Sequence, residues 1–473
     1  MLLQITEPDD LDTGDGASLA IGIDLGTTHS VVAYVEADIV NGHIVKTLTI
    51  GESPLVPSIV SMSGEHVGTA ALHTEAPFRS TKRLFDYPEK PICTTDKTPV
   101  MVAARILYFL REQAENALNQ SITQAVITVP AYFDEPARQA TKKAAAMAGL
   151  DVLRLISEPT AAALAYGLEH KREGLYAIYD LGGGTFDFSL LRLQDSVFQV
   201  LATGGDTHLG GDDIDEAILK LWQIHKDDFP QWIHIARKAK EQLSQHDSVT
   251  LENFTLTRDQ LGTLAQPFIS KTLHICDNVL RDAGISTDEL DGIVLVGGST
   301  RLHTIQSTLT TFFKKPPLTN INPDEVVAHG AALQAHALTK GANTLLLDVT
   351  PLSLGVETMG GLFEKIIPRN TPIPCHLAQD FTTYVDDQDA MSIHILQGEK
   401  DMIGDCRSLG TFTLTGIPPM PSGTARIRVS FHLDADGILM VSAQEQTTGI
   451  QQTITLNPAQ DLNEDGMKKL LTG

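Results

Sequence analysis

Two short segments combine an acidic residue with glycine and hydroxyl residues, a pattern suited to binding phosphate and a cation. Residues 21–30 read IGIDLGTTHS, and residues 177–185 read AIYDLGGGT. In each, a β-rich run ends in Asp-Leu-Gly, and we expect the glycines to turn tightly because glycine tolerates positive φ. Such turns align backbone N–H groups into an anion cradle, and Asp24 and Asp180 can hold a metal ion or its waters. With VGGSTR at residues 296–301, the pattern predicts a nucleotide gripped between two related halves.

The residues around these loops predict two α/β lobes. Residues 19–62 read as four strands, the last of them PSIVSM, separated by Gly, Asn and Pro turns. Asp134 is placed to cap a helix that has Pro136 in its first turn and Gly149 at its end. The alanine-rich helix that follows, EPTAAALAYG, is expected to end at Gly167.

From Tyr176 onward the same plan repeats, with strands first and helices afterwards. The expected helices cover residues 212–225, 231–244, 258–283, 302–313 and 324–339, and one helix at 100–118 belongs to the first half. Strands followed by helices, twice over, imply two lobes with a cleft between them.

The pattern changes near Lys340. From Thr350 onward apolar residues alternate with polar ones, as in residues 427–433 and again in residues 439–443, with the turn Asp-Ala-Asp-Gly between these runs. This alternation predicts a hairpin with one buried face. Residues 349–456 are therefore expected to form a separate all-β sandwich.

The composition fits a globular protein of more than one domain, because 473 residues exceed what one hydrophobic core usually serves. A net charge of −24, from 35 basic and 59 acidic residues, argues against nonspecific binding to nucleic acid or to a membrane surface. The acidic start of the chain is unlike a secretory signal, and no long apolar run predicts a membrane span. The cysteines are scattered and fit a reducing, cytoplasmic compartment; they are Cys93, Cys276, Cys375 and Cys406.

Together these pieces resemble the DnaK-type, or seventy-kilodalton heat-shock, chaperones from about Ala20 to Leu456. The motifs occur in order: IGIDLGTT, ITVPAYFDEPARQAT, SEPTAAALAYG, YDLGGGTFDFS, GGDTHLGGDDID, VLVGGSTR, NPDEVVAHGAA and LLLDVTPLSLG. The resemblance implies an actin-like (ribonuclease H-like) two-lobed α/β ATPase domain followed by an all-β sandwich that binds peptide. The implied divisions are a flexible arm (1–18), the ATPase domain (19–339, with lobes at about 19–166 and 167–339), a linker (340–348), the sandwich (349–456) and the start of a lid segment (457–473).

Within the family, the likeness is to the HscA-type chaperones of iron–sulfur cluster assembly. It is carried by LLQITEP, IPRNTPIP, FTTYVDDQDAMSIH and QGEKDMIGDCRSLGTFTLTGIPPMPSG. It implies the scaffold protein IscU as the client and an HscB-type J-domain protein as the co-chaperone. Stretches near residues 83–102 and 222–236 are short for the family, so a GrpE-type exchange factor is not expected. The sequence stops at Gly473, so the family's helical lid is expected to be absent and peptide exchange to be fast.

The resemblance assigns the chemistry of ATP hydrolysis residue by residue. Asp24, Asp180 and Asp187 match residues around Mg²⁺, Lys82 matches a lysine that contacts the γ-phosphate and the attacking water, and Glu158 matches a carboxylate near that water. Taken alone, Lys82 would be a solvated surface charge and Glu158 a helix-start acid that favours the dipole. The matching phosphate-side residues are Gly26, Thr27, Thr28, Gly182, Gly183, Gly184, Thr185, Gly210 and Gly211.

The adenosine side of ATP or ADP is matched less completely. Arg237 stands where the family has Glu, and Glu241 stands at a position that is often basic or apolar. His29, where relatives carry Tyr or Asn, puts an accompanying K⁺ site in question. The adenosine-side residues that do match are Lys240, Gly297, Gly298, Ser299, Arg301 and Asp324.

Further matches concern coupling and the peptide groove. Pro130 and Arg138 match a switch proline and an arginine relay. A linker that docks on the ATPase domain in one state and is free in another is matched by Leu345, Leu346, Leu347 and Asp348, although three leucines could also be one more buried strand. The groove for an extended apolar peptide is matched by residues that would singly read as plain core: Leu354, Val356, Met359, Phe381, Tyr384, Met391 and Ile393.

Two other classes of protein compete with this interpretation. Sugar kinases and actin-like filament proteins share duplicated phosphate loops, but the linker and the alternating β segment argue against them. A degenerate lidless peptide-binding protein with a weak or absent ATPase cycle is suggested by the missing lid, Arg237 and Glu241. The retained set of Lys82, Glu158, Asp180 and Asp187 argues against degeneration.

Overall fold

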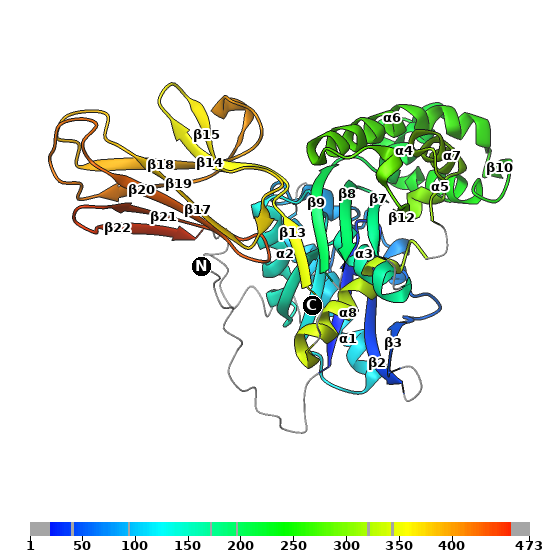
Figure 1. The fold of residues 1–473 in the computed structure, drawn as a ribbon. Coiled ribbons are helices and arrows are strands. Elements are labelled where there is room, and N and C mark those ends of the chain that lie inside the picture. Colours follow the sequence, from blue (N-terminus) through cyan, green and yellow to red (C-terminus); the bar gives the residue numbers. More distant parts are fainter. Residues whose placement is uncertain are drawn as a thin grey trace.

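The computed structural model describes residues 19–38, 42–92, 95–170, 173–194, 197–318, 322–341 and 345–455. They form two α/β lobes and a β-sandwich that extends away from them (Figure 1). The predicted N-terminal arm, Cys93 and the predicted lid segment lie outside the described residues. Within the described part of the chain, no helix combines the length and the apolar character needed to cross a bilayer.

The first lobe is built on a sheet with the strand order β3-β2-β1-β5-β6, and β4 pairs with β2. The strands are β1 (Ala20–Leu25), β2 (His29–Asp38), β3 (Gly42–Thr47), β4 (Val56–Pro57), β5 (Gln124–Val129) and β6 (Asp151–Ser157). Helices α1 (Pro99–Leu118) and α2 (Glu135–Met147) pack against this sheet in one apolar cluster. The predicted cap of α2 is confirmed, because the Asp134 carboxylate accepts a hydrogen bond from the Ala137 N–H at 3.1 Å.

The second lobe contains a sheet with the order β12-β7-β8-β9-β13-β16. Its strands are β7 (Gly174–Leu181), β8 (Phe186–Gln194), β9 (Val197–Asp206), β12 (Gly292–Val296), β13 (Leu345–Val349) and β16 (Pro372–Ile373). The predicted order of strands and then helices is confirmed by α4 (Gly211–Leu221), α5 (Phe229–Gln242), α6 (Arg258–Ala283) and α7 (His303–Phe313). A small hairpin, β10 (Ser248–Leu251) and β11 (Phe254–Thr257), lies between α5 and α6 in the chain.

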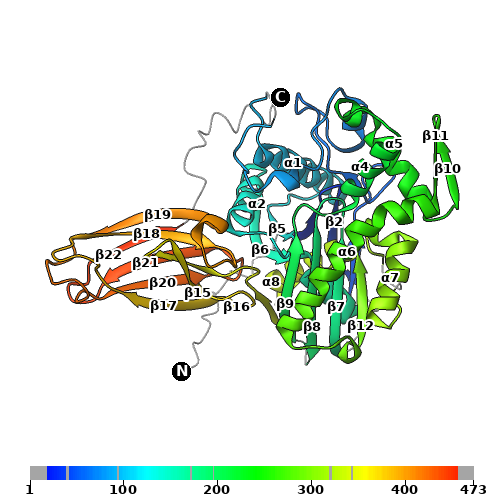
Figure 2. The same cartoon turned by 90° about the horizontal axis from the view of Figure 1, so that it is seen from above.

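Two helices, α3 (Glu158–His170; Figure 1) and α8 (Val326–Lys340; Figures 1 and 2), pack with strands of both sheets in one apolar cluster. Helix α8 approaches β1 and α3 so closely that only glycine fits at the two contacts. A Cβ on Gly22 would lie 2.1 Å from the Ala332 nitrogen, and one on Gly330 would lie 1.8 Å from the Ala161 oxygen. The two lobes are therefore joined by close helix packing beneath the loops that follow β1 and β7.

Two local predictions were wrong. The expected strand at 57–62 reduces to β4 and isolated bridges, because Val60 pairs with Phe78 and Val67, which lie in irregular segments. Helix α3 does not end at Gly167 but continues to His170. Gly167 instead allows close packing, since a Cβ there would lie 2.6 Å from side-chain carbons of Leu193 and Phe198.

The all-β region forms two four-stranded sheets, as predicted for a sandwich. One has the order β15-β14-β18-β19 and the other β17-β20-β21-β22. The predicted hairpin is confirmed as β20 and β21, whose alternate residues are buried. The strands are β14 (Leu354–Thr358), β15 (Leu362–Ile367), β17 (Cys375–Phe381), β18 (Ala390–Gln397), β19 (Arg407–Thr415), β20 (Ile427–Leu433), β21 (Leu439–Glu445) and β22 (Gln451–Thr455).

Strand β13 lies between the second lobe and the sandwich and contains residues 345–348 of the predicted linker, whereas residues 342–344 lie outside the described part of the chain. Leu345, Leu346 and Leu347 pair in parallel with residues of β9, and Asp348 and Val349 pair with β16. In Figure 1 this yellow strand runs beside β9 before the chain enters the sandwich. The leucines thus form a strand at the edge of the lobe's sheet, which is also the arrangement expected of a docked linker.

Candidate active site

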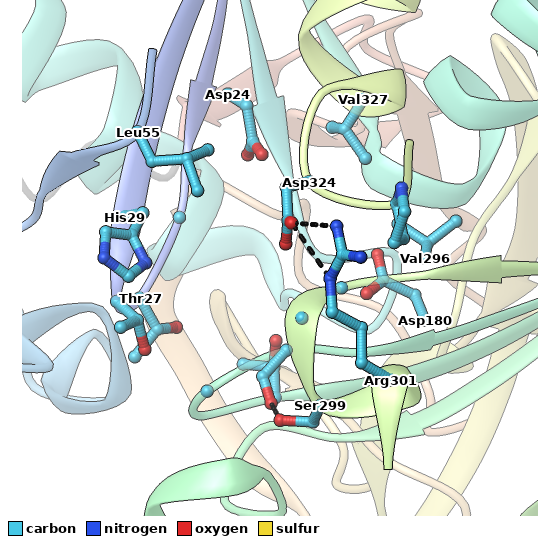
Figure 3. Close-up of a pocket in the computed structure, with 18 of the residues that line it drawn as sticks. Asp24, Thr27, His29, Leu55, Asp180, Val296, Ser299, Arg301, Asp324 and Val327 are labelled. Carbon is cyan, nitrogen blue, oxygen red and sulfur yellow. Dashed lines mark hydrogen bonds and ion pairs between the residues drawn. The ribbon is translucent and has the colours of Figure 1, made fainter. Parts of the chain in front are cut away.

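A cavity of about 470 Å³ lies between the two lobes, where the glycine-rich loops converge. In Figure 3, Thr27 and His29 line one side of this cavity, and Val296 and Arg301 line the other. The predicted residues on its wall are Asp24, Gly26, Thr27, Thr28, Lys82, Glu158, Asp180, Gly182, Gly183, Thr185, Lys240, Gly297, Gly298, Ser299, Arg301 and Asp324. The other four, Asp187, Gly184, Gly210 and Gly211, lie directly behind wall residues.

Three carboxylates gather at the base of the cavity. Asp24 ends β1, whereas Asp180 and Asp187 face each other on the paired strands β7 and β8. Burial, followed by the charge of Glu158, raises the pKa of Asp24 and of Asp187 to about 7, and the same causes raise the pKa of Asp180. Charged carboxylates crowded in this way favour a cation between them.

Lys82 and Glu158 form a buried ion pair beside these carboxylates. Their side chains are 6% and 9% exposed, and the Lys82 Nζ lies 2.5 Å from the Glu158 carboxylate. The same Nζ donates a hydrogen bond to the Leu25 carbonyl at 2.6 Å, which fixes it next to the first phosphate loop. The interpretation of Lys82 as a solvated surface charge is therefore wrong. Glu158 does begin α3, as expected of a helix-start acid, but its carboxylate is buried and paired with Lys82.

The arrangement fits a magnesium ion with a phosphate group. Thr28 Oγ1 and Asp187 Oδ2 are buried and have no hydrogen-bond partner among the described residues. No three His, Cys, Asp or Glu side chains in the described ranges are close enough to enclose a metal by themselves. This suits Mg²⁺, which keeps several waters and uses only one or two protein carboxylates together with substrate phosphates.

The glycines of the phosphate loops are needed for space and not for positive φ. None of Gly26, Gly182, Gly183 and Gly184 has the positive φ that we expected. Instead, a Cβ on Gly183 would lie 1.8 Å from Thr28 Oγ1, which belongs to the other lobe's loop. Of the predicted glycines, Gly297 does have a positive φ, of 82°.

Another part of the cavity wall combines apolar side chains with the Arg301–Asp324 ion pair. The Arg301 guanidinium donates to Asp324 Oδ2 from Nε at 3.2 Å and to Asn322 Oδ1 at 2.9 Å, as the dashed lines to Asp324 in Figure 3 indicate. Ser299 Oγ donates to the Gly182 carbonyl at 2.8 Å. The sequence analysis assigned no role to the apolar residues of the cavity wall, which are Val31, Leu55, Val296, Leu302 and Val327.

The residues that depart from the family pattern also line the cavity. Arg237 pairs with Asp212 at 2.6 Å and with Asp215 at 3.1 Å. Lys240 pairs with Asp215 at 2.6 Å and donates to the Gly211 carbonyl at 2.7 Å. Arg237 is therefore compensated by carboxylates on α4, and the sequence had pointed to neither of them. Burial together with Arg237 lowers the pKa of His29.

The residues predicted to couple the domains lie where the sandwich meets the first lobe. Arg138 is buried, and its Nη1 donates to the Asp436 carbonyl at 3.1 Å. Asp436 also receives the Leu155 backbone N–H at 2.9 Å and the Lys142 ammonium at 2.7 Å. Pro130 is buried at the end of β5, and its carbonyl accepts from the Phe133 N–H. Thr160 Oγ1 donates to Asp348 Oδ2 at 3.4 Å.

The predicted peptide-groove residues divide by exposure. Leu354, Val356 and Ile393 are buried in the core of the sandwich, and Phe381 and Met391 pack against that core. Met359 and Tyr384 are 74% and 73% exposed. A role in peptide binding stays a prediction for all seven.

Comparisons with known proteins agree with this architecture. The family model described as Hsp70 protein matches residues 89–472. A chaperone protein HscA homolog of Acidithiobacillus ferrooxidans is 46% identical over 519 residues, covering 99% of this chain and 83% of that protein. Proteins with the same name from Methylobacillus flagellatus and Laribacter hongkongensis are each 47% identical, covering 99% and 100% of this chain and 83% of either relative.

Proposed function

The chain belongs to the Hsp70 family, and we propose that it is an ATP-driven chaperone of the HscA type that acts in iron–sulfur cluster assembly. The observation that carries the proposal is the cavity between the lobes, in which two glycine loops face a buried lysine–glutamate pair and three carboxylates. Phosphoryl transfer depends mainly on positioning and charge neutralisation, and these groups supply both.

The proposed reaction is ATP hydrolysis to ADP and phosphate. Mg²⁺, when bound, neutralises phosphate charge, and we assign Asp24, Asp180 and Asp187 to hold it and its waters. Lys82, fixed by Glu158 and the Leu25 carbonyl, is assigned to the γ-phosphate and the attacking water. Thr27, Thr28 and Thr185 offer hydroxyls on the cavity wall.

The proposed coupling runs through residues 340–348 as the linker between the ATPase domain (19–339) and the peptide-binding sandwich (349–456). Its support is strand β13, which pairs with β9 through residues 345–347 and with β16 through residues 348–349. Arg138 and Asp436 make a second link between these regions. Coupling of this kind is typically worth ~1–3 kcal/mol and acts reciprocally on ATP and client.

The proposed partners follow from the HscA-type likeness. The client is an extended segment of the scaffold protein IscU, and an HscB-type J-domain protein stimulates hydrolysis, both in the cytoplasm. The degenerate peptide binder is not favoured, because the carboxylates and the Lys82–Glu158 pair are assembled and Arg237 is neutralised by Asp212 and Asp215.

The test is single-turnover hydrolysis of Mg·ATP with and without an IscU-derived peptide and the HscB-type protein. We expect slow basal hydrolysis that both partners accelerate together. Binding of the peptide without any hydrolysis would establish the degenerate alternative. Hydrolysis that no addition of peptide changes would remove the coupling from the proposal and leave an uncoupled ATPase.

A further inference from the structure

Three polar side chains on the sandwich form a hydrogen-bonded chain that is separate from the cavity between the lobes. His394 Nδ1 lies 2.8 Å from Glu357 Oε2, and His394 Nε2 lies 2.8 Å from Ser408 Oγ. The residues come from β14, β18 and β19, which lie side by side in the yellow and orange sheet of Figure 1. Neither the ATP site nor the predicted peptide groove includes any of the three.

The alternation of side chains along β14 and β18 directs two of these groups away from the core. Val356 pairs with Ile395, and both are buried inside the sandwich. Glu357 and His394 are the adjacent residues on the two antiparallel strands, so their side chains lie opposite each other on the outer face of the sheet. The Glu357 side chain is 37% exposed and that of His394 is 26% exposed, so a molecule in solution can reach both.

A β-bulge brings Ser408 to the same face. The register of the earlier pairs along β18 would place Ser408 opposite Gln397, whose side chain is buried. The register shifts instead, so that Ser408 pairs with Leu396 and Leu409 becomes an extra residue on β19. This shift turns the exposed Ser408 hydroxyl toward the face that carries His394.

The carboxylate of Glu357 determines which nitrogen of neutral His394 carries the hydrogen. An ionised carboxylate only accepts hydrogen bonds, so Nδ1 is the donor to Glu357. Nε2 is then the nitrogen with the lone pair, and it accepts the Ser408 O–H. An acid that orients an imidazole, which in turn accepts from a serine hydroxyl, is the arrangement that activates serine as a nucleophile.

We propose that Ser408, His394 and Glu357 form a second reactive site, which takes acyl groups from small activated esters. The carbonyl carbon of an ester is the electrophile that suits a serine nucleophile, and an exposed sheet face admits a small acyl group directly. None of the three residues is on the wall of the nucleotide cavity, so the inference goes beyond the proposed ATPase and does not depend on it.

The proposed reaction has two steps. In the first, Ser408 Oγ bonds to the acyl carbon and its proton passes to His394 Nε2. The bond from that carbon to the leaving oxygen breaks, and the leaving group keeps the electron pair and takes the proton from Nε2. In the second step, a water oxygen bonds to the acyl carbon and gives a proton to Nε2. The bond to Ser408 Oγ then breaks, and Ser408 recovers that proton, so that an ester and water become an acid and an alcohol.

The test measures acetyl transfer from p-nitrophenyl acetate to the full chain. Stopped-flow absorbance follows release of p-nitrophenolate, and peptide mass spectrometry locates the acetyl group. We expect a burst in the wild type with the acetyl group on Ser408. Ser408→Ala should remove the burst, and His394→Gln should slow it at least about 100-fold, as expected for loss of a general base. Ser392→Ala, which removes another exposed serine of β18, is the matched control and should react as the wild type does.

Two further variants separate the chemistry from the stability of the sheet. Ser408→Cys keeps a nucleophile at the same position and should keep the burst. Glu357→Gln can present an amide N–H to Nδ1, which leaves the hydrogen on Nε2, so it should slow the burst and keep its amplitude. Circular dichroism and Mg·ATP hydrolysis check that each variant is folded.

Two results would overturn the proposal. One is acetylation of Ser408 that is no faster than acetylation of Ser392 in the wild type. The other is an unchanged burst rate in folded His394→Gln, because the serine would then react without its base.

Discussion

Buried charges at the base of the cavity determine what single residues can do there. Lys82 is the cation among the described residues that lies closest to Glu158, and both side chains are withdrawn from water. Removing one partner of such a pair leaves the other charge buried without compensation, which is more costly than removing both.

We therefore expect Lys82→Met to lower the free energy of unfolding by about 3–5 kcal/mol, and Lys82→Met/Glu158→Gln to recover part of that loss. Lys82→Met should also slow single-turnover hydrolysis by about 100-fold or more, since it removes a charge assigned to the phosphate. Urea unfolding and rapid-quench measurements check these effects. If the single variant were as stable as the double variant, leaving Glu158 buried without Lys82 would carry no extra cost, which would contradict this account of the pair.

Glu135 in α2 makes the contact with the sandwich sensitive to pH. It is buried beside Leu433 and Gly437, and Gln139 and the Leu439 N–H hydrogen-bond to it. Burial raises its pKa from about 4.5 to about 7, and burial also raises the pKa of Asp134, against the opposing effect of Arg407.

Between about pH 4.5 and pH 7, the form in which the sandwich is docked on the first lobe therefore binds more protons than a form in which Glu135 faces water. Docking should strengthen as the pH falls from 8 to 6 and weaken as it rises through about 7. Fluorescence energy transfer between the second lobe and the sandwich checks this. Glu135→Gln should flatten the dependence, whereas Glu216→Gln, on an exposed part of α4, should not. An unchanged pH profile in Glu135→Gln would contradict the assignment.

Some site residues could be predicted from the sequence and others could not. Asp24, Asp180 and the glycine loops carry a local signal, because acid, glycine and hydroxyl residues are adjacent in the chain. Asp212 and Asp215 lie within the matched motif GGDDID, yet their bonds to Arg237 depend on how α4 meets α5. Glu135 lies within the matched motif ITVPAYFDEPARQAT, yet its burial comes from a strand about three hundred residues later, which the motif does not indicate.

At the scale of elements, β13 is the connection that a single substitution can test. Leu346 packs against the cluster between the two sheets, whereas Leu345 is exposed at the same edge. Leu346→Asp should release β13 from β9 and abolish stimulation by the client peptide while basal hydrolysis is kept. Leu345→Asp is the matched control and should have a smaller effect. Full stimulation in Leu346→Asp would remove β13 from the coupling.

The periodicity of the sequence predicted which segments form helices and strands better than it predicted which of these elements contact each other. The helix predicted at 258–283 matches α6, and the alternating run around 427–443 forms β20 and β21. The role of Gly167 was misjudged because a glycine that permits close packing inside a helix looks the same in sequence as one that ends it. The contact between Gly330 and Ala161 likewise depends on how α3 and α8 meet.

For the whole molecule, Asp436 joins the sandwich to the first lobe through several polar contacts. Its carboxylate meets Lys142, Arg154 and the Leu155 N–H, and its carbonyl meets Arg138. Asp436→Ala should separate the sandwich from the first lobe and reduce peptide stimulation at least about tenfold, as expected for losing more than 1.4 kcal/mol of coupling.

ADP affinity should change little in this variant, because the nucleotide cavity is elsewhere. Energy transfer between the regions and single-turnover rates are the measurements. Asp380→Ala breaks an exposed ion pair with Arg428 on the same sandwich and serves as the control. Equal stimulation in the two variants would mean that Asp436 does not couple the regions.

The pairing of β13 with β9 affects how force is transmitted between the sandwich and the lobes. Three residue pairs among the described residues hold it to β9, and the chain continues from that strand into the sandwich. A client under tension, as when a partly folded protein is pulled, would load those few hydrogen bonds along the strand axis. These hydrogen bonds should break before the sandwich or the lobes unfold. Strand β13 would therefore limit the force that reaches the catalytic lobes.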